Sequence, residues 1–148
     1  MINIRMSKPS EAPVIIAIWR RSVDATHDFL TANDRKEIEK DVVEFFSTHP
    51  VWVAVNSDNQ LSGFMFLHDG HLEALFVDAS ARGCGVGKEL LLHAVSLHPN
   101  LTVDVNEQNQ QALGFYQHMG FQISGRSELD GQGRPYPLLH LSRADNGI

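Results

Sequence analysis

The spacing of hydrophobic residues in the first third of the chain predicts one strand and two helices. Residues 2–6 alternate between apolar and polar, which is typical of a half-buried strand. Apolar residues then recur three and four positions apart from Glu11 to about Val23, and again from about residue 33 to 47. Ser10 is placed to cap the first helix, because a serine hydroxyl can accept a hydrogen bond from a first-turn amide.

The middle of the chain changes to the two-residue period of antiparallel strands. Residues 51–55, 61–68 and 71–77 are rich in apolar and β-branched side chains, and polar turn sequences separate them. These three runs predict a meander, in which each strand pairs with the next along the chain.

Helices and strands alternate in the last part of the chain. Helices are expected at 86–97 and 109–118, and strands at 101–105, 121–128 and 136–141. The strand-helix-strand order favours a parallel pair in the middle of the sheet, joined by a right-handed crossover. The expected fold class is therefore α/β (α+β), with a mixed, mostly antiparallel sheet of about seven strands flanked by about four helices. One domain is expected to span residues 1–148.

Composition narrows the class of protein without naming a function. No apolar run approaches the ~20 residues of a membrane span, and the start of the chain lacks a signal-peptide pattern, so a cytoplasmic protein is expected. The net charge is −6 and the twelve basic residues are scattered, which argues against binding to nucleic acid or to an anionic membrane. The single cysteine, Cys84, cannot form an internal disulfide, in agreement with a reducing compartment.

A glycine-rich loop, Arg82-Gly83-Cys84-Gly85-Val86-Gly87-Lys88, lies between a predicted strand and a predicted helix. Its glycines let successive amide groups converge, and the helix N-terminus adds a partial positive charge, so the loop suits a pyrophosphate. Arg82 and Lys88 add full charges. A P-loop is excluded because Glu89 stands where that motif needs Ser or Thr, and a dinucleotide fold would carry its glycines after the first strand.

The loop also resembles the first signature of the GNAT superfamily of N-acetyltransferases, Gln/Arg-x-x-Gly-x-Gly/Ala, over residues 82–87. Residues 109–121 resemble the second signature, an Asn, Ala, Phe-Tyr and Gly-Phe pattern, and the expected order of elements is similar over nearly the whole chain. More narrowly, residues 22–30 and 126–139 look like the bacterial YjaB-type subgroup.

This resemblance implies acetyl-CoA bound between the fourth and fifth strands, with Asn109 facing the pantetheine arm and Tyr116 the thioester sulfur. Family members often pair, so a homodimer is also an expectation. The implied donor-binding residues follow the pantetheine and then the pyrophosphate: Leu75, Phe76, Val77, Arg82, Gly83, Cys84, Gly85, Val86, Gly87, Lys88 and Asn109.

Transfer to an amine needs a base, because an alkyl ammonium with a pKa of ~10.4 must first lose a proton. His71 and Glu73 share one face of their predicted strand. His71 is the expected base, since an unperturbed imidazole has a pKa of ~6.5, and Glu73 is the substitute, directly or through water. The alternative for His71 is an ordinary histidine of an amphipathic strand. Tyr116 is the expected acid for the leaving thiolate, and its alternative is a core aromatic residue.

The acceptor is expected to contact His27, Asp28 and Phe29, between the first two helices, although helix capping or core packing would also explain these residues. The eight histidines lack metal-ligand spacing, so no metal is expected. The chain is thus interpreted as an N-acetyltransferase that transfers an acetyl group from acetyl-CoA to a primary amine of a small molecule or peptide, by direct attack in a ternary complex. The alternative is a non-catalytic acyl-CoA sensor.

Overall fold

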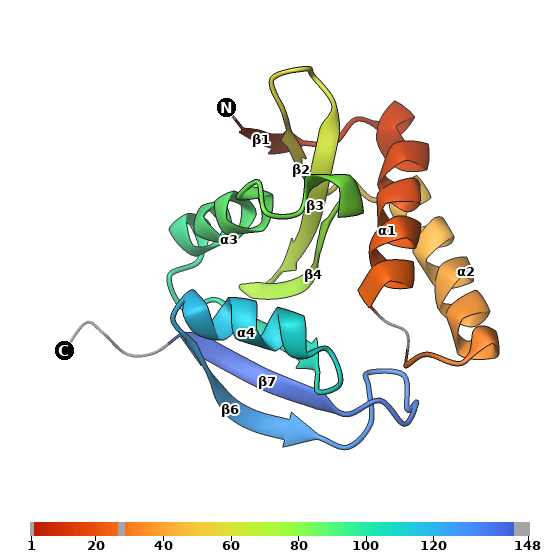
Figure 1. Cartoon of the computed structure of the whole chain (residues 1–148), viewed down its shortest axis with the longest axis vertical. Helices are drawn as coiled ribbons and strands as arrows, with labels where there is room; N and C mark the ends of the chain where they lie inside the picture. Colours follow the sequence, from red (N-terminus) through yellow and green to blue (C-terminus); the bar gives the residue numbers. More distant parts are fainter. Residues whose placement is uncertain (1, 27–28, 144–148) are drawn as a thin grey trace. The chain divides into compact units, whose positions relative to one another are not determined.

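The computed structural model describes residues 2–26 and 29–143 (Figure 1). The order of its helices and strands is the predicted one, with two short 3₁₀ turns added, η1 (Pro9–Glu11) and η2 (Ala79–Ala81). The other elements are β1 (Asn3–Met6), α1 (Ala12–Thr26), α2 (Ala32–Thr48), β2 (Trp52–Val55), β3 (Leu61–His68), β4 (His71–Val77), α3 (Val86–Leu97), β5 (Thr102–Asn106), α4 (Gln110–His118), β6 (Phe121–Ser127) and β7 (Leu138–Arg143).

The seven strands form one mixed sheet in the order β1-β2-β3-β4-β5-β7-β6. Neighbours pair antiparallel at β1–β2, β2–β3, β5–β7 and β7–β6, whereas β4 and β5 are parallel, with His71 opposite Thr102 and Leu72 opposite Val103. The predicted fold class and its central parallel pair are therefore confirmed. No helix in the described ranges is long and apolar enough to cross a membrane.

The chain divides into two compact units, Met1–Phe66 with Ala74–His93, and Leu67–Glu73 with Ala94–Ile148. We refer to them as the first and second units and describe each by itself. The organisation as one domain over residues 1–148 stays a prediction.

The core of the first unit forms where α1 and α2 pack on the sheet. The apolar stripe of α1 buries Ile15, Ile18 and Trp19 in one cluster with Val53 and Phe64 of the strands. The two helices run side by side (Figure 1), and the guanidinium of Arg35 lies 4.9 Å from the centre of the Trp19 ring. The apolar residues that recur with a helical period in the sequence are thus the ones on the buried face of each helix.

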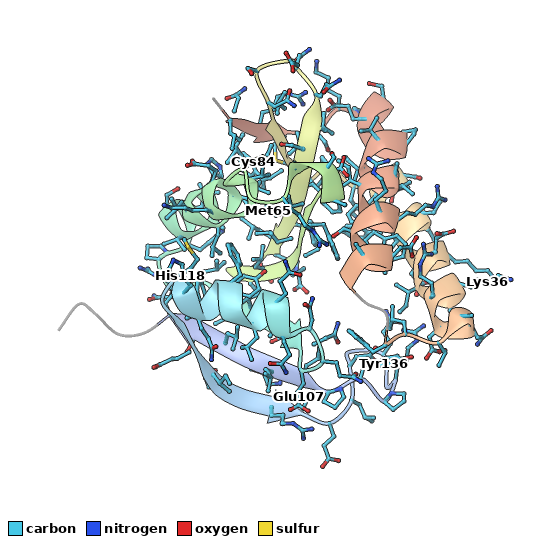
Figure 2. The ribbon with its side chains drawn as sticks, viewed as in Figure 1. Lys36, Met65, Cys84, Glu107, His118 and Tyr136 are labelled. Carbon is cyan, nitrogen blue, oxygen red and sulfur yellow. The ribbon has the colours of Figure 1, made fainter. Side chains whose placement is uncertain are left out.

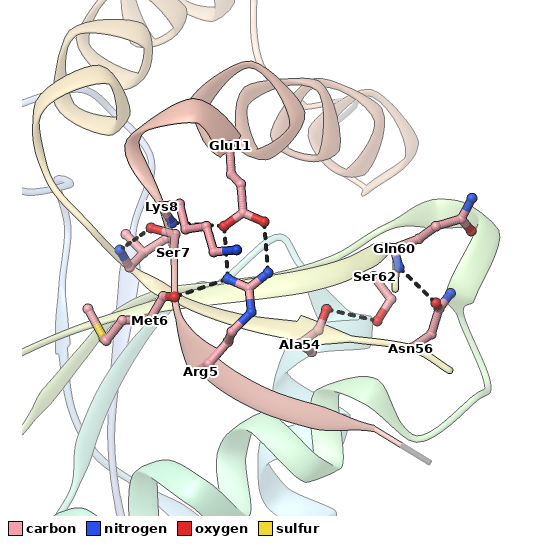
Figure 3. Close-up of polar contacts among 10 residues, drawn as sticks. Arg5, Met6, Ser7, Lys8, Glu11, Ala54, Asn56, Gln60 and Ser62 are labelled. Atoms are coloured by element: carbon pink, nitrogen blue, oxygen red, sulfur yellow. Dashed lines mark hydrogen bonds and ion pairs between the residues drawn. The ribbon is translucent and has the colours of Figure 1, made fainter. Parts of the chain in front are cut away.

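The segment before α1 differs from the sequence prediction, because Ser10 does not cap the helix. Ser10 lies inside η1, which begins at Pro9, a residue whose fixed φ suits the first position of a helical turn. The carboxylate of Glu11 accepts instead, from the Lys8 amide at 2.8 Å and from two nitrogens of Arg5 at 2.9 Å each (Figure 3). The helical segment therefore begins before Ser10, and Glu11 accepts from the residue that precedes the turn.

The second unit places α4 on one face of β5, β7 and β6. Val103 and Leu141 are buried and lie opposite each other on β5 and β7, and Phe121 of β6 shares their face. The ring of Tyr116 lies 5.9 Å from that of Phe121, so α4 covers this face. Because side chains alternate along a strand, Asp104 lies on the other face of the sheet.

Candidate active site

Residues 82–85 of the glycine loop lie between η2 and α3 and are exposed, and residues 86–88 form the first turn of α3; Cys84 marks the loop in Figure 2. The loop was predicted to follow a strand directly, and η2 is inserted between that strand and the loop. Gly83 and Gly85 have φ angles of 80° and 81°, in the left-handed region that favours glycine. Nothing lies within 4 Å of a Cβ built on either residue. The backbone conformation, rather than crowding, therefore requires glycine at these two positions.

The amide groups at the start of α3 are available to a ligand. Within the described part of the chain, the amides of Gly85, Val86, Gly87 and Lys88 donate to no backbone carbonyl, whereas the Glu89 amide donates to Gly85 at 3.0 Å. A helix of 12 residues concentrates a partial positive charge at this end. Four successive N–H groups with two flanking cations form the kind of site that binds phosphate oxygens.

Packing fixes the loop against the sheet at Gly63, in the middle of β3. A Cβ at this position would lie 2.9 Å from Cγ1 of Val86 and 2.9 Å from the carbonyl oxygen of Phe76. The first turn of α3 can therefore rest directly on the strand backbone only because residue 63 has no side chain. The sequence analysis missed Gly63, although a glycine inside a strand is a signal of such close approach.

An ion pair anchors the segment that leads into the loop. The Arg21 guanidinium of α1 donates to both carboxylate oxygens of Asp78, over 2.9 and 3.0 Å, and the Asp78 amide donates to the Ser62 carbonyl at 2.9 Å. Hydrogen bonds from Arg21 hold the pKa of Asp78 below its ordinary value. Both residues escaped the sequence analysis, because 57 positions separate them in the chain.

A cavity of about 820 Å³ in the first unit opens beside the loop. Cys84, Val86 and Ala81 line it together with Asp78 and the β2–β3 hairpin. Leu75, Phe76 and Val77, the predicted pantetheine contacts, are half-buried at the end of β4. Their role stays a prediction.

The second unit holds the predicted acid. Tyr116 is 6% exposed between the rings of Phe115 and Phe121, and burial raises the pKa of its hydroxyl. Within the described residues, this hydroxyl makes no hydrogen bond. Asn109 caps α4 by accepting from the Ala112 amide at 3.2 Å, a structural role that the sequence analysis did not assign.

The predicted base has two partners on β5. Nδ1 of His71 lies 2.6 Å from the Thr102 hydroxyl, and Nε2 lies 3.4 Å from a carboxylate oxygen of Asp104. The parallel register brings Thr102 opposite His71, and the strand period puts Asp104 on the same face. Glu73, the proposed substitute, is exposed. The sequence analysis missed both partners, whose signal is a polar residue at every second position of a strand that is otherwise buried.

Two of the predicted acceptor contacts, His27 and Asp28, lie outside the described residues. Phe29 is half-buried in the turn that precedes α2. Within the described ranges, no group of three or more His, Cys, Asp or Glu side chains is arranged so that it could hold a metal ion.

Comparisons with known proteins identify the family to which this fold and sequence belong. The model of the acetyltransferase (GNAT) domain matches residues 47–123. The chain is 54% identical to the peptidyl-lysine N-acetyltransferase YjaB of Escherichia coli K12, over 96% of this chain and 97% of the relative. It is 44% identical to the 5-NmdU N-acetyltransferase of Pseudomonas phage PaMx11, over 90% of this chain and 95% of that one. The solution structure of apo YjaB from Escherichia coli superposes with a TM-score of 0.93 at 53% identity, covering 97% and 98% of the two chains. The resemblance noted in the sequence is thereby confirmed: the chain belongs to the GNAT family of acetyltransferases and is an N-acetyltransferase.

Proposed function

We propose that this N-acetyltransferase takes an acetyl group from acetyl-CoA and transfers it to the side-chain amine of a lysine in a peptide or protein. The observation that carries the donor assignment is the run of four amides from Gly85 to Lys88, which have no backbone acceptor in the described chain. The name of the YjaB relative supports the acceptor class. A cytoplasmic location and a homodimer remain proposals.

The donor pyrophosphate would be held mainly by backbone amides of residues 83–88, with Arg82 and Lys88 supplying charge. The pantetheine arm would lie along Leu75–Val77 and reach toward Asn109. The Asn109 side-chain oxygen accepts from the Ala112 amide, and its amide nitrogen would donate to the arm.

The acceptor would lose its proton to His71 through the hydroxyl of Thr102. The Asp104 carboxylate lies 3.4 Å from Nε2 of His71 and can only accept a hydrogen bond, which favours the tautomer with the hydrogen on Nε2 and the lone pair on Nδ1. That lone pair points to the Thr102 hydroxyl at 2.6 Å. Thr102 can therefore accept the proton of the amine while passing its own to Nδ1. Asp104 would orient the imidazole through its contact with Nε2.

Tyr116 would assist the departure of CoA. Burial keeps its hydroxyl protonated, and that hydroxyl has no competing partner among the described residues. It can donate a hydrogen bond to the sulfur as negative charge develops there, and then its proton. Tyr116 lies on the face that α4 covers, whereas Asp104 lies on the other. The acid and the base would then act from different sides of β5.

The test measures thiol release from acetyl-CoA, together with the mass gain of defined acceptors. A lysine peptide is expected to gain one acetyl group, and the same peptide with arginine in place of lysine is the matched control. The compound 5-NmdU, named as the acceptor of the phage relative, serves as a competing acceptor.

Preferential acetylation of 5-NmdU would overturn the lysine proposal. Donor binding without acetylation of either acceptor would favour the alternative of an acyl-CoA sensor. A chain that does not bind acetyl-CoA would contradict both the proposed transfer from acetyl-CoA and the alternative of an acyl-CoA sensor.

A further inference from the structure

Asp104, which lies beside His71, also belongs to a second group of hydrogen-bonded side chains on the same face of the second unit. The hydroxyl of Ser127, at the end of β6, lies 2.6 Å from Nε2 of His140 on β7. Nδ1 of the same imidazole lies 2.6 Å from a carboxylate oxygen of Asp104 on β5. A hydroxyl, an imidazole and a carboxylate are thus joined in series across three neighbouring strands.

Strand register explains why these side chains meet. Asp104 and His140 are direct partners in the β5–β7 ladder and therefore point to the same face. On β6, the pairing runs from Ile123 opposite Leu141 to Gly125 opposite His140, which leaves Ser124 as a bulge.

The bulge decides which way Ser127 points. With continuous pairing, Ser124 would lie opposite His140, and Ser127 would point to the face of the buried Leu139. The extra residue reverses the alternation and turns Ser127 toward His140, as bulges beside functional sites often do.

The proton positions follow from the carboxylate. Asp104 only accepts, so Nδ1 of His140 carries the hydrogen of that bond, and Nε2 is left with a lone pair. Nε2 then accepts from the Ser127 hydroxyl. This is the tautomer in which an imidazole can remove a proton from a serine, with a third group holding the ring in place.

Reagents can reach the pair. The His140 side chain is 37% exposed, and Ser127 is half-buried. Gly125 lies opposite His140 and has no side chain to cover the ring; a Cβ built there would lie 3.4 Å from Cδ2 of the imidazole. A small acyl ester can therefore approach the hydroxyl from solvent.

We propose that Ser127 is a nucleophile, activated by His140 and oriented through Asp104, that accepts acyl groups from small activated esters. Its oxygen bonds to the carbonyl carbon while the bond from that carbon to the leaving oxygen breaks. The Ser127 proton passes to Nε2 of His140 and then to the departing alkoxide or phenoxide. Water, deprotonated by the same imidazole, hydrolyses the acyl-serine, so that a carboxylic acid and the free hydroxyl result. This activity is distinct from acetylation of an amine.

The experiment uses the whole chain without CoA or amine, so its outcome is independent of the proposed donor and acceptor. The protein is incubated with an alkyl fluorophosphonate, which modifies activated serines, and the labelled peptide is identified by mass spectrometry. Hydrolysis of p-nitrophenyl acetate is followed in parallel. The variants are Ser127→Ala, His140→Gln and, as matched control, Ser124→Ala; Ser124 lies on the same strand but donates to the His140 carbonyl at 3.1 Å.

The expected result is a label on Ser127 in the wild-type chain and in Ser124→Ala, none at that position in Ser127→Ala, and labelling slower by about 100-fold or more in His140→Gln. Circular dichroism checks that each variant is folded. A wild-type chain whose Ser127 remains unmodified would overturn the proposal. Labelling of Ser127 that is equally fast in a folded His140→Gln variant would also overturn it, because the serine would then not be activated by the imidazole.

Discussion

The Arg21 guanidinium and the Asp78 carboxylate meet through two parallel hydrogen bonds that join α1 to the segment leading into the glycine loop. The side chain of Asp78 is 12% exposed, whereas that of Arg21 is 53% exposed. Breaking the pair would therefore cost more at the buried carboxylate, because water can solvate the guanidinium but not the carboxylate. A bidentate pair of this kind fixes direction as well as distance.

Replacing Asp78 by Asn is therefore expected to destabilise the fold by about 1–3 kcal/mol near neutral pH. The pKa of Asp78 is depressed in the folded state, so its contribution is complete above the unfolded pKa of ~3.9 and is lost as pH falls through the lower folded value. Urea titrations of both proteins at pH 7 and below pH 3 measure this difference. A gap that stays the same at the lower pH would contradict the assignment. Glu107→Gln, which breaks an exposed pair with Arg126, is the control and should leave the midpoint near that of the wild type.

Glu11 is expected to stay ionised in acid that protonates ordinary glutamates. Hydrogen bonds from Arg5 lower the pKa of Glu11 from 4.5 to about 2. The stability that this pair contributes is therefore present above the unfolded pKa and disappears as pH falls toward about 2. The carboxyl ¹³C shift of Glu11, followed by NMR from pH 6 downward, measures the midpoint. Arg5→Met should return it to the range of a free glutamate, and an unchanged midpoint in that variant would refute Arg5 as the cause.

Gly63→Ala is expected to destabilise the first unit by about 1–3 kcal/mol, because the new methyl group would meet Val86 and the backbone of Phe76 at 2.9 Å. Gly114→Ala is the matched change, since nothing lies within 4 Å of its Cβ and it belongs to α4. It should stabilise the chain by about 0.5–1 kcal/mol through helix propensity. Thermal unfolding of the two variants should shift in opposite directions; a shift in the same direction would contradict the packing described for β3.

Tyr116→Phe removes one oxygen and keeps the ring among its aromatic neighbours. If the hydroxyl assists CoA departure, kcat for lysine peptide acetylation should fall by about 100-fold or more, with little change in KM for acetyl-CoA. Steady-state kinetics and a melting curve together test this role. A variant as active as the wild type would leave Tyr116 as a core aromatic residue, the alternative noted in the sequence.

The hydroxyl of Thr102 is expected to be necessary for transfer, because it is the group hydrogen-bonded to Nδ1 of His71 and would carry the proton from the amine to this nitrogen. Thr102→Ser keeps the hydroxyl and should keep most of the activity, whereas Thr102→Val, which matches threonine in shape, should lower kcat by about 100-fold. The same peptide assay compares them. Full activity in Thr102→Val would mean that the amine reaches a base by another route, and Glu73→Gln would then be the variant to measure.

Local patterns were sufficient to predict most of the fold. The two-residue period gave the bounds of β3 and β4, and the helical period gave those of α3, because burial of one face determines both patterns. The cap at Ser10 was mispredicted, because η1 begins at Pro9 and places Ser10 inside the first helical turn, while Glu11 accepts from the Lys8 amide that precedes this turn. The hydrogen bonds at a helix end depend on which polar side chains lie nearby in space, and the spacing of apolar residues does not indicate this.

The candidate site was predictable only where it is local. The glycine loop is a continuous segment, and its conformation follows from its own residues. His71 could be named from its strand, but its contact with Asp104 depends on which strands become neighbours, and the pair of Arg21 with Asp78 depends on how α1 lies on the sheet. The contact of Ser127 with His140 could not be predicted for a further reason: strict alternation along β6 would have placed Ser127 on the opposite face of the sheet.

The bulge at Ser124 gives β6 one residue more than the paired stretch of β7. Deleting Ser124 would join Ile123 to Gly125 and leave a regular ladder in which Gly125 still lies opposite His140, so Arg126 and Ser127 would keep their present faces. Deleting a regularly paired residue such as Gln122 would instead shift the register by one position and exchange the faces of the residues on one side of the deletion. Ser124 is therefore the one position between Ile123 and Gly125 where β6 can lose a residue and still present Ser127 beside His140.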